Sequence, residues 1–156
     1  MAEMTTIQVS KESAATMRQT YPNLTYEEIV RRLIAQDLVD LDTRIIEFTK
    51  LIKPGYQDEQ VRQPGTKGLI TAVVMHFPTG TCGLVEVRVI KQSHKGGQEY
   101  LVPSIEGAFI ALDDAPFVSG PLSIPVESRD TIRVEWYNYD GGFAHTVPVF
   151  VFVNKV

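Results

Sequence analysis

The chain has 156 residues and a net charge of −4, with 15 Lys and Arg against 19 Asp and Glu. This mildly acidic balance lacks the strong positive charge of a dedicated nucleic-acid-binding protein. Cys82 is the single cysteine, which excludes an internal disulfide framework and a cysteine-rich zinc site. The polar stretch Met1–Ser10 does not resemble a signal peptide, and no apolar run reaches membrane length. We therefore expect a protein of the cytoplasm or of an assembled virion, with no membrane partner.

Two periods of apolar residues divide the chain. Apolar side chains recur mostly at helical spacing over residues 5–52 and mostly alternate at strand spacing over residues 69–153. The pattern predicts an α+β fold, in which an N-terminal strand-helix-helix with a long second helix precedes an antiparallel β-sandwich or jelly roll. The expected domains are residues 1–53 and 67–156, joined by a Pro-Gly-rich linker at 54–66.

The N-terminal pattern begins with Thr5–Ser10, which alternates like a short strand. A helix is expected after Ser10, and a second begins at Thr25, where Glu28 completes a capping box. The strings TIQVSKE (6–12) and TYEEIVRRLI (25–34) resemble the ribbon-helix-helix family, especially its antitoxin branch, over residues 5–35.

The resemblance implies that two copies pair their strands, with Ile7 and Val9 at the contact between copies. It also implies DNA-facing residues, which would be Thr6, Gln8, Ser10, Thr25 and Tyr26. Strands of this family usually direct Arg or Lys outward, and this strand carries neither. Because neutralising phosphates supplies much of the affinity for DNA, pairing of copies is the favoured use, and DNA binding is the alternative.

Apolar residues at spacings of 4, 3, 4, 3 and 4 continue the second helix as a coiled-coil seam. The seam residues are Ile34, Leu38, Leu41, Ile45, Phe48 and Ile52. They predict self-association, and the alternative is one amphipathic helix packed on its own β domain.

Short strands with regular turn signals predict the β-sandwich. They are expected at 69–77, 84–90, 100–102, 108–112, 122–126, 131–137 and 146–153. Alternation directs Val85, Val87 and Val89 inward, and a hairpin turn is expected at 94–97.

The last strand is apolar on both faces, because Phe150 and Phe152 alternate with valines. The N-terminal helix or the linker would cover the phenylalanine face in one interpretation. A neighbouring subunit would cover it in the other.

Three short motifs resemble accessory β-sandwich proteins of tailed-phage particles. They are the acidic pair Asp113–Asp114, the YNYD loop at Tyr137–Asp140, and the HTV that follows at His145–Val147. The resemblance covers residues 69–153 and implies a protein that binds a capsid or another particle surface.

Reactive groups form no catalytic pattern. His76, Cys82 and His94 lack the spacing of metal ligands, so we expect no catalytic site, no metal and no cofactor. The leading hypothesis is a non-enzymatic, self-associating structural protein that displays a β-sandwich, and its concrete form is a virion accessory protein. The alternatives are a DNA-binding regulator and a sugar-binding module that uses Tyr137 and Tyr139.

Overall fold

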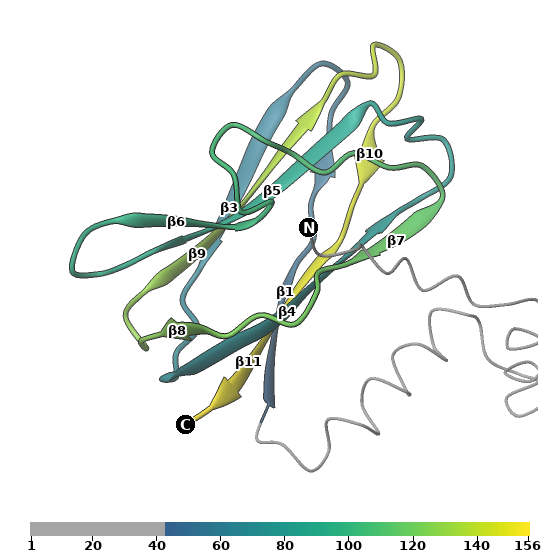
Figure 1. The fold of residues 1–156 in the computed structure, drawn as a ribbon. Coiled ribbons are helices and arrows are strands. Elements are labelled where there is room, and N and C mark those ends of the chain that lie inside the picture. The colour runs from purple at the N-terminus through teal and green to yellow at the C-terminus, as the bar shows by residue number, and fades with distance from the viewer. Residues whose placement is uncertain (1–42) are drawn as a thin grey trace, which may run out of the picture. The chain divides into compact units, whose positions relative to one another are not determined.

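The computed structural model describes residues 43–156, and Arg44–Val156 forms one compact unit. Eleven strands follow one another along this part of the chain (Figure 1). Their bounds are β1 Thr43–Phe48, β2 Leu51–Ile52, β3 Gln57–Arg62, β4 Gly68–Phe77, β5 Val85–Gln92, β6 Gln98–Val102, β7 Ala115–Val118, β8 Ile124–Val126, β9 Thr131–Asn138, β10 His145–Thr146 and β11 Val149–Lys155.

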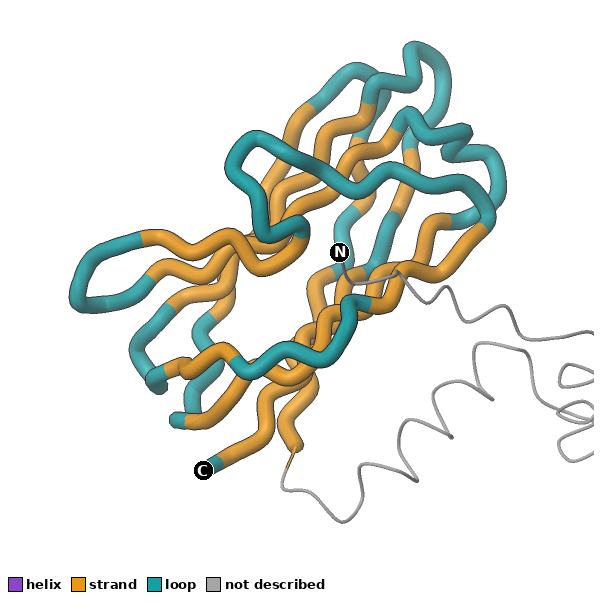
Figure 2. Tube along the Cα trace, in the orientation of Figure 1, coloured by secondary structure: helices purple, strands orange, loops and turns teal. Residues whose placement is uncertain are grey.

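Two main sheets form a β-sandwich around one core (Figure 1). The first has the order β1-β11-β4-β7, with β8 also paired to β4, and the second has the order β3-β9-β5-β6. The short strands β10 and β2 pair separately. A long segment between β6 and β7 passes from the second sheet to the first (Figure 2).

The core consists of side chains that alternate inward from both sheets. Val85, Val87 and Val89 on β5 are fully buried, as are Ile132 and Val134 on β9. The predicted inward direction of the β5 valines is therefore confirmed. Trp136 also lies in the core, with Nε1 donating to the Val147 carbonyl at 2.9 Å. That bond satisfies the one polar group of the largest buried side chain.

The expected hairpin turn after β5 is also confirmed. The backbone N–H of Gly96 donates to the Ser93 carbonyl, and Ser93 N–H donates to the Gly97 carbonyl. Both glycines have positive φ, +96° and +95°, a region that other L-residues rarely adopt. The two glycines therefore allow β5 and β6 to pair as neighbours.

The predicted α+β class is wrong for this protein. Residues 43–52, expected to end the long second helix, form β1 and β2, and there is no helix anywhere in 43–156. The coiled-coil seam is therefore absent at Ile45, Phe48 and Ile52. β1, with Ile45 and Phe48, pairs with β11 and buries alternate residues, and β2, with Ile52, pairs with β10. The ribbon-helix-helix segment, residues 5–35, lies outside the described residues.

The stretch expected to link the two domains, residues 54–66, contains β3. This strand pairs with β9 along its whole length, from Gln57 opposite Tyr137 to Arg62 opposite Ile132. It is an edge strand of the second sheet. Of the C-terminal strands, the expected strand at 108–112 contributes a single bridge between Ile110 and Val87, and β7 was not expected.

Candidate functional site

The outer side of the first sheet carries an apolar surface, which we call the apolar face. Strand register places Val118, Val74 and Phe150 in one row across β7, β4 and β11. Ala72 and Phe152 form a second row beside it. Ile45 on β1 and Val118 on β7 are 50% and 45% exposed, whereas Val74 and Phe150 are half-buried and Phe152 is buried.

The apolar face arises because β4 and β11 are apolar on both sides. Their inward residues, including Met75 opposite Val149 and Val73 opposite Val151, fill the core. The apolar outward residues of these two strands therefore do not contribute to the core. Such a two-sided strand is typical of a sheet that is covered on both faces.

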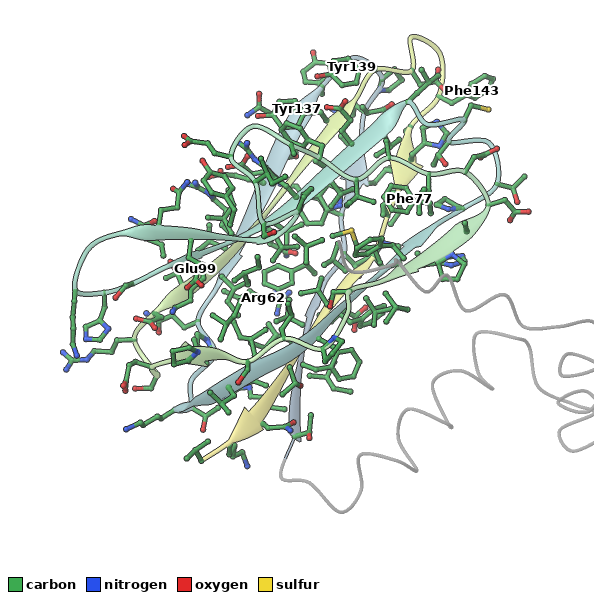
Figure 3. The ribbon with its side chains drawn as sticks, in the orientation of Figure 1. Arg62, Phe77, Glu99, Tyr137, Tyr139 and Phe143 are labelled. Carbon is green, nitrogen blue, oxygen red and sulfur yellow. The ribbon has the colours of Figure 1, made fainter. Side chains whose placement is uncertain are left out.

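The outer side of the second sheet carries aromatic rings, which we call the aromatic strip. It consists of Tyr137 and Tyr139 on and just after β9, with Phe109 from the segment between β6 and β7. The two tyrosine rings are nearly parallel, at 15° with centroids 6.4 Å apart. Phe109 stands edge-on to Tyr137, at 77° and 5.0 Å. Figure 3 shows the two tyrosines beside each other at one end of the sandwich, with Phe143 apart from them.

Polar side chains flank the strip on both sides. Across the sheet, Tyr137 lies opposite Gln57 on β3 and opposite Glu86 on β5. The negative charge of Glu86 is the main cause that raises the pKa of Tyr139, and burial and a hydrogen bond between these side chains add to it.

An ion network on the neighbouring residues of β5 and β9 packs against the aromatic strip. The Arg88 guanidinium lies over the Phe109 ring at 4.5 Å and over the Tyr100 ring at 5.7 Å. Arg88 Nε donates to Glu135 at 2.6 Å, and Arg133 Nε lies 3.0 Å from the same carboxylate. Glu135 is only 5% exposed, so both arginines compensate a buried charge.

Two histidine–aspartate pairs order loops. His145 Nε2 lies 2.9 Å from Asp140, whose other oxygen accepts from the N–H groups of Gly142 and Phe143. The bond to His145 is the main cause that lowers the Asp140 pKa, and the backbone donors add to it. His94 Nδ1 lies 2.8 Å from Asp130. Both carboxylates stabilise turns by accepting local donors.

The remaining reactive groups lie apart. Cys82 is exposed in the turn before β5, and its N–H donates to Asp113. His76 lies on β4 opposite Pro116. Within residues 43–156, no group of three or more His, Cys, Asp or Glu side chains is placed to hold a metal ion. The same part of the chain contains no helix of a length and apolarity that would span a membrane.

The predicted interface residues fall into three groups. Phe48 and Ile52 lie in the core, whereas Ile45, Phe150 and Phe152 lie on the apolar face. The others lie outside the described residues: Ile7, Val9, Ile34, Leu38 and Leu41, with the DNA-facing candidates Thr6, Gln8, Ser10, Thr25 and Tyr26.

Sequence reasoning missed several members of both surfaces. Val74 and Val118 complete the apolar row, and the continuous apolar run of β4 was a signal for the first of them. Phe109 joins Tyr137 across a long loop, and no sequence pattern indicates that contact. Trp136 is in the core, as alternation predicts, so Tyr137 and Tyr139 are the outward members of the YNYD motif.

No model of a known protein family matches the chain, and no curated protein matches it. Among solved structures, it is similar to the Yersinia pseudotuberculosis-derived mitogen, at 10% identity and a TM-score of 0.46, over 72% of this chain and 88% of that one. It is also similar to the Aeromonas sobria serine protease in complex with its chaperone, at 11% identity and a TM-score of 0.37, over 74% of this chain and 27% of that one. A third similarity is to the tripod from the baseplate of bacteriophage Tuc2009, at 10% identity and a TM-score of 0.33, over 80% of this chain and 98% of that one. All three TM-scores are below 0.5, so none of these proteins indicates what this one binds or does.

Proposed function

We propose that this protein is a non-enzymatic structural protein whose copies associate through the apolar face of the sandwich. The observation that carries the proposal is the row Val118–Val74–Phe150 across three neighbouring strands. Its members are aliphatic and aromatic side chains, which supply contact area and no reactive group. Val118 at the end of the row is 45% exposed, and apolar side chains on the outer side of a sheet are typical of protein–protein contacts.

A second copy of the chain is the partner that fits this face. In two copies related by a two-fold axis, the same patch of each copy contacts the other. Any charged side chain near the axis would therefore face an identical charge. The two rows across β7, β4 and β11 contain no charged side chain, so like charges do not oppose one another there, and Glu47 lies at the edge of the face on β1. Two sheets can pack face to face with interdigitated side chains, as the two sheets of the sandwich do internally.

The setting of such an assembly is suggested by the sequence alone. The acidic pair at Asp113–Asp114, the YNYD loop and the HTV that follows resemble accessory proteins of tailed-phage particles. We infer that the assembled copies display the sandwich on a virus particle or a comparable surface.

Light scattering of the full chain at micromolar concentration tests the proposal. The protein should be oligomeric, and Val118→Lys should weaken association about tenfold or more, because it places a charge in the apolar contact. Val118 is 45% exposed on the edge strand β7, so the variant should still fold.

Val61→Lys is the matched control. Val61 is an equally exposed valine, at 49%, on the edge strand β3 of the other sheet. Its variant should keep the wild-type mass. A monomeric wild-type protein, or equal masses for all three proteins, would contradict the proposal.

A further inference from the structure

We propose that the aromatic strip is a carbohydrate-binding site that takes an uncharged sugar ring. The ring would stack on Tyr139 and bond its hydroxyls to Glu86 and Gln57. The proposal concerns the outer side of the second sheet, which faces away from the apolar face across the core.

The geometry of the rings is the first argument. Tyr139 is 61% exposed, and its ring is nearly parallel to that of Tyr137. Because the two rings are stacked and not coplanar, the flat surface is that of the exposed Tyr139 ring alone. A site for an ammonium ion instead surrounds the cation with several rings. A flat aromatic surface matches the apolar C–H face of a pyranose ring. Phe109 stands edge-on to Tyr137 and supports the ring against which Tyr139 is stacked.

The polar neighbours are the second argument. A sugar presents hydroxyls around the edge of its ring, and each needs a donor or an acceptor when it leaves water. Gln57 and Glu86 lie on either side of Tyr137 in one row across the sheet. An amide supplies both donors and acceptors, and a carboxylate supplies acceptors. Binding sites typically combine aromatic surface with a few such polar groups.

The charges argue against an anionic ligand. Glu86 lies directly beside the tyrosines, and Glu59 lies in the next row of the sheet. The nearby cation, Arg88, is engaged by Glu135 and packed over Phe109. A phosphate backbone or a sulfated glycan would therefore meet negative charge at the strip, since its compensating cation is already paired.

The strip is also preorganised, which lowers the entropic cost of binding. Tyr139 continues the sheet, because its N–H donates to the Leu84 carbonyl. Its ring is stacked with that of Tyr137, and Phe109 is held between Arg88 and Tyr137. A ligand would meet rings that already have fixed positions.

Saturation-transfer NMR on the full chain tests the proposal. The probes are maltotetraose, cellotetraose, chitotetraose, galactobiose and rhamnose, with heparin and choline as charged probes. We expect at least one neutral saccharide to bind. Tyr139→Ala should weaken that binding about tenfold or more through loss of the stacking surface. Tyr139→Phe should retain most of it, because the ring remains.

Phe143→Ala is the matched control, since Phe143 is 71% exposed on the loop beside the strip but takes no part in the stack. It should bind as the wild type does. The proposal is overturned if no neutral saccharide binds, if heparin or choline alone binds, or if Tyr139→Ala and Phe143→Ala affect binding equally. Thermal melts of all variants confirm that the loss is local.

Discussion

Asp130 joins two turns that are far apart in sequence. One carboxylate oxygen accepts from the His94 N–H at 3.0 Å and lies 2.8 Å from His94 Nδ1, and the other accepts from the Glu127 N–H at 2.9 Å. Burial by itself would raise the pKa of this carboxyl group. The bonds from Glu127 and His94 outweigh burial and lower the pKa to about 2, from an ordinary value of 3.8.

This lowered pKa predicts an acid-dependent part of the stability. The group is charged in the folded protein down to a lower pH than in the unfolded chain, so its contribution is complete above pH 3.8 and is lost as the pH falls towards 2. The loss amounts to about 2 kcal/mol. Urea unfolding at several pH values should show a shallower decline for Asp130→Asn than for the wild type. Parallel curves for the two proteins would contradict the assignment.

Asn138 fastens the loop between β9 and β10. Its Nδ2 donates to the carbonyls of Ile52, Lys53 and Phe143, and its Oδ1 accepts from the Asp140 N–H. The residue is 2% exposed, and its bond to the Ile52 carbonyl is buried, whereas the other three bonds are part-buried.

Asn138→Ala should therefore lower the free energy of unfolding by about 2–4 kcal/mol, because several buried polar groups lose their partners. Denaturant unfolding measures the change. Phe143→Ala is the control, since it keeps the carbonyl that Asn138 uses and should change the unfolding free energy by less than about 0.5 kcal/mol. Equal effects of the two substitutions would show that the amide bonds are not responsible.

At the scale of elements, β1 shows how packing overrides a sequence period. Ile45 and Phe48 fit a heptad seam with Ile52, yet Ile46 and Phe48 also alternate with Ile45 and Glu47. Both periods are present because Ile45 and Ile46 are both apolar. Pairing with β11 selects the alternating period, which buries Ile46 and Phe48.

This assignment predicts different costs for two apolar residues of one strand. Phe48→Ala should destabilise the protein by about 3–5 kcal/mol, because Phe48 is fully buried and a cavity would remain. Ile45→Ala should change the stability by less than about 0.5 kcal/mol, since Ile45 is half exposed. Denaturant unfolding of both variants checks this. In a helical seam, both residues would lie on the same buried side, and the two costs would be similar.

The central strands were predictable because one side of each faces the apolar core. On β5, β9 and β11, most inward residues are apolar, so alternation alone located these strands, and Asn138 at the end of β9 is a polar exception. β7 was missed because it has four residues and includes Pro116, which signals a turn. It is tolerated at the edge of the first sheet, paired with the end of β4.

For the whole molecule, the two proposed surfaces lie on opposite outer sides of one sandwich. Association through the apolar face would leave every aromatic strip free. An assembly would then bind a glycan-coated surface through several weak sites at once, which raises the apparent affinity without any new contact.

This arrangement predicts that loss of association changes avidity for a dense sugar surface but not the affinity of a single aromatic strip. Val118→Lys should leave the affinity for a soluble oligosaccharide unchanged and weaken binding to the same sugar immobilised at high density by about a hundredfold, through loss of avidity. Surface plasmon resonance at high and low sugar density measures this. Equal binding of Val118→Lys and wild type at high density would contradict coupling between the two surfaces, even if each surface acts alone.

The sequence by itself determined where the inward faces of the central strands lie, which turn joins β5 to β6, and that Phe150 and Phe152 leave β11 apolar on both sides. These follow from alternation and turn chemistry, which are local. Only the tertiary structure decided that residues 43–52 form strands, because β1 pairs with β11 and β2 with β10, both about a hundred residues away. It also decided the members of both surfaces. Val118 meets Val74 through strand pairing and Phe109 meets Tyr137 through a loop, and both contacts exist only once distant segments are packed together.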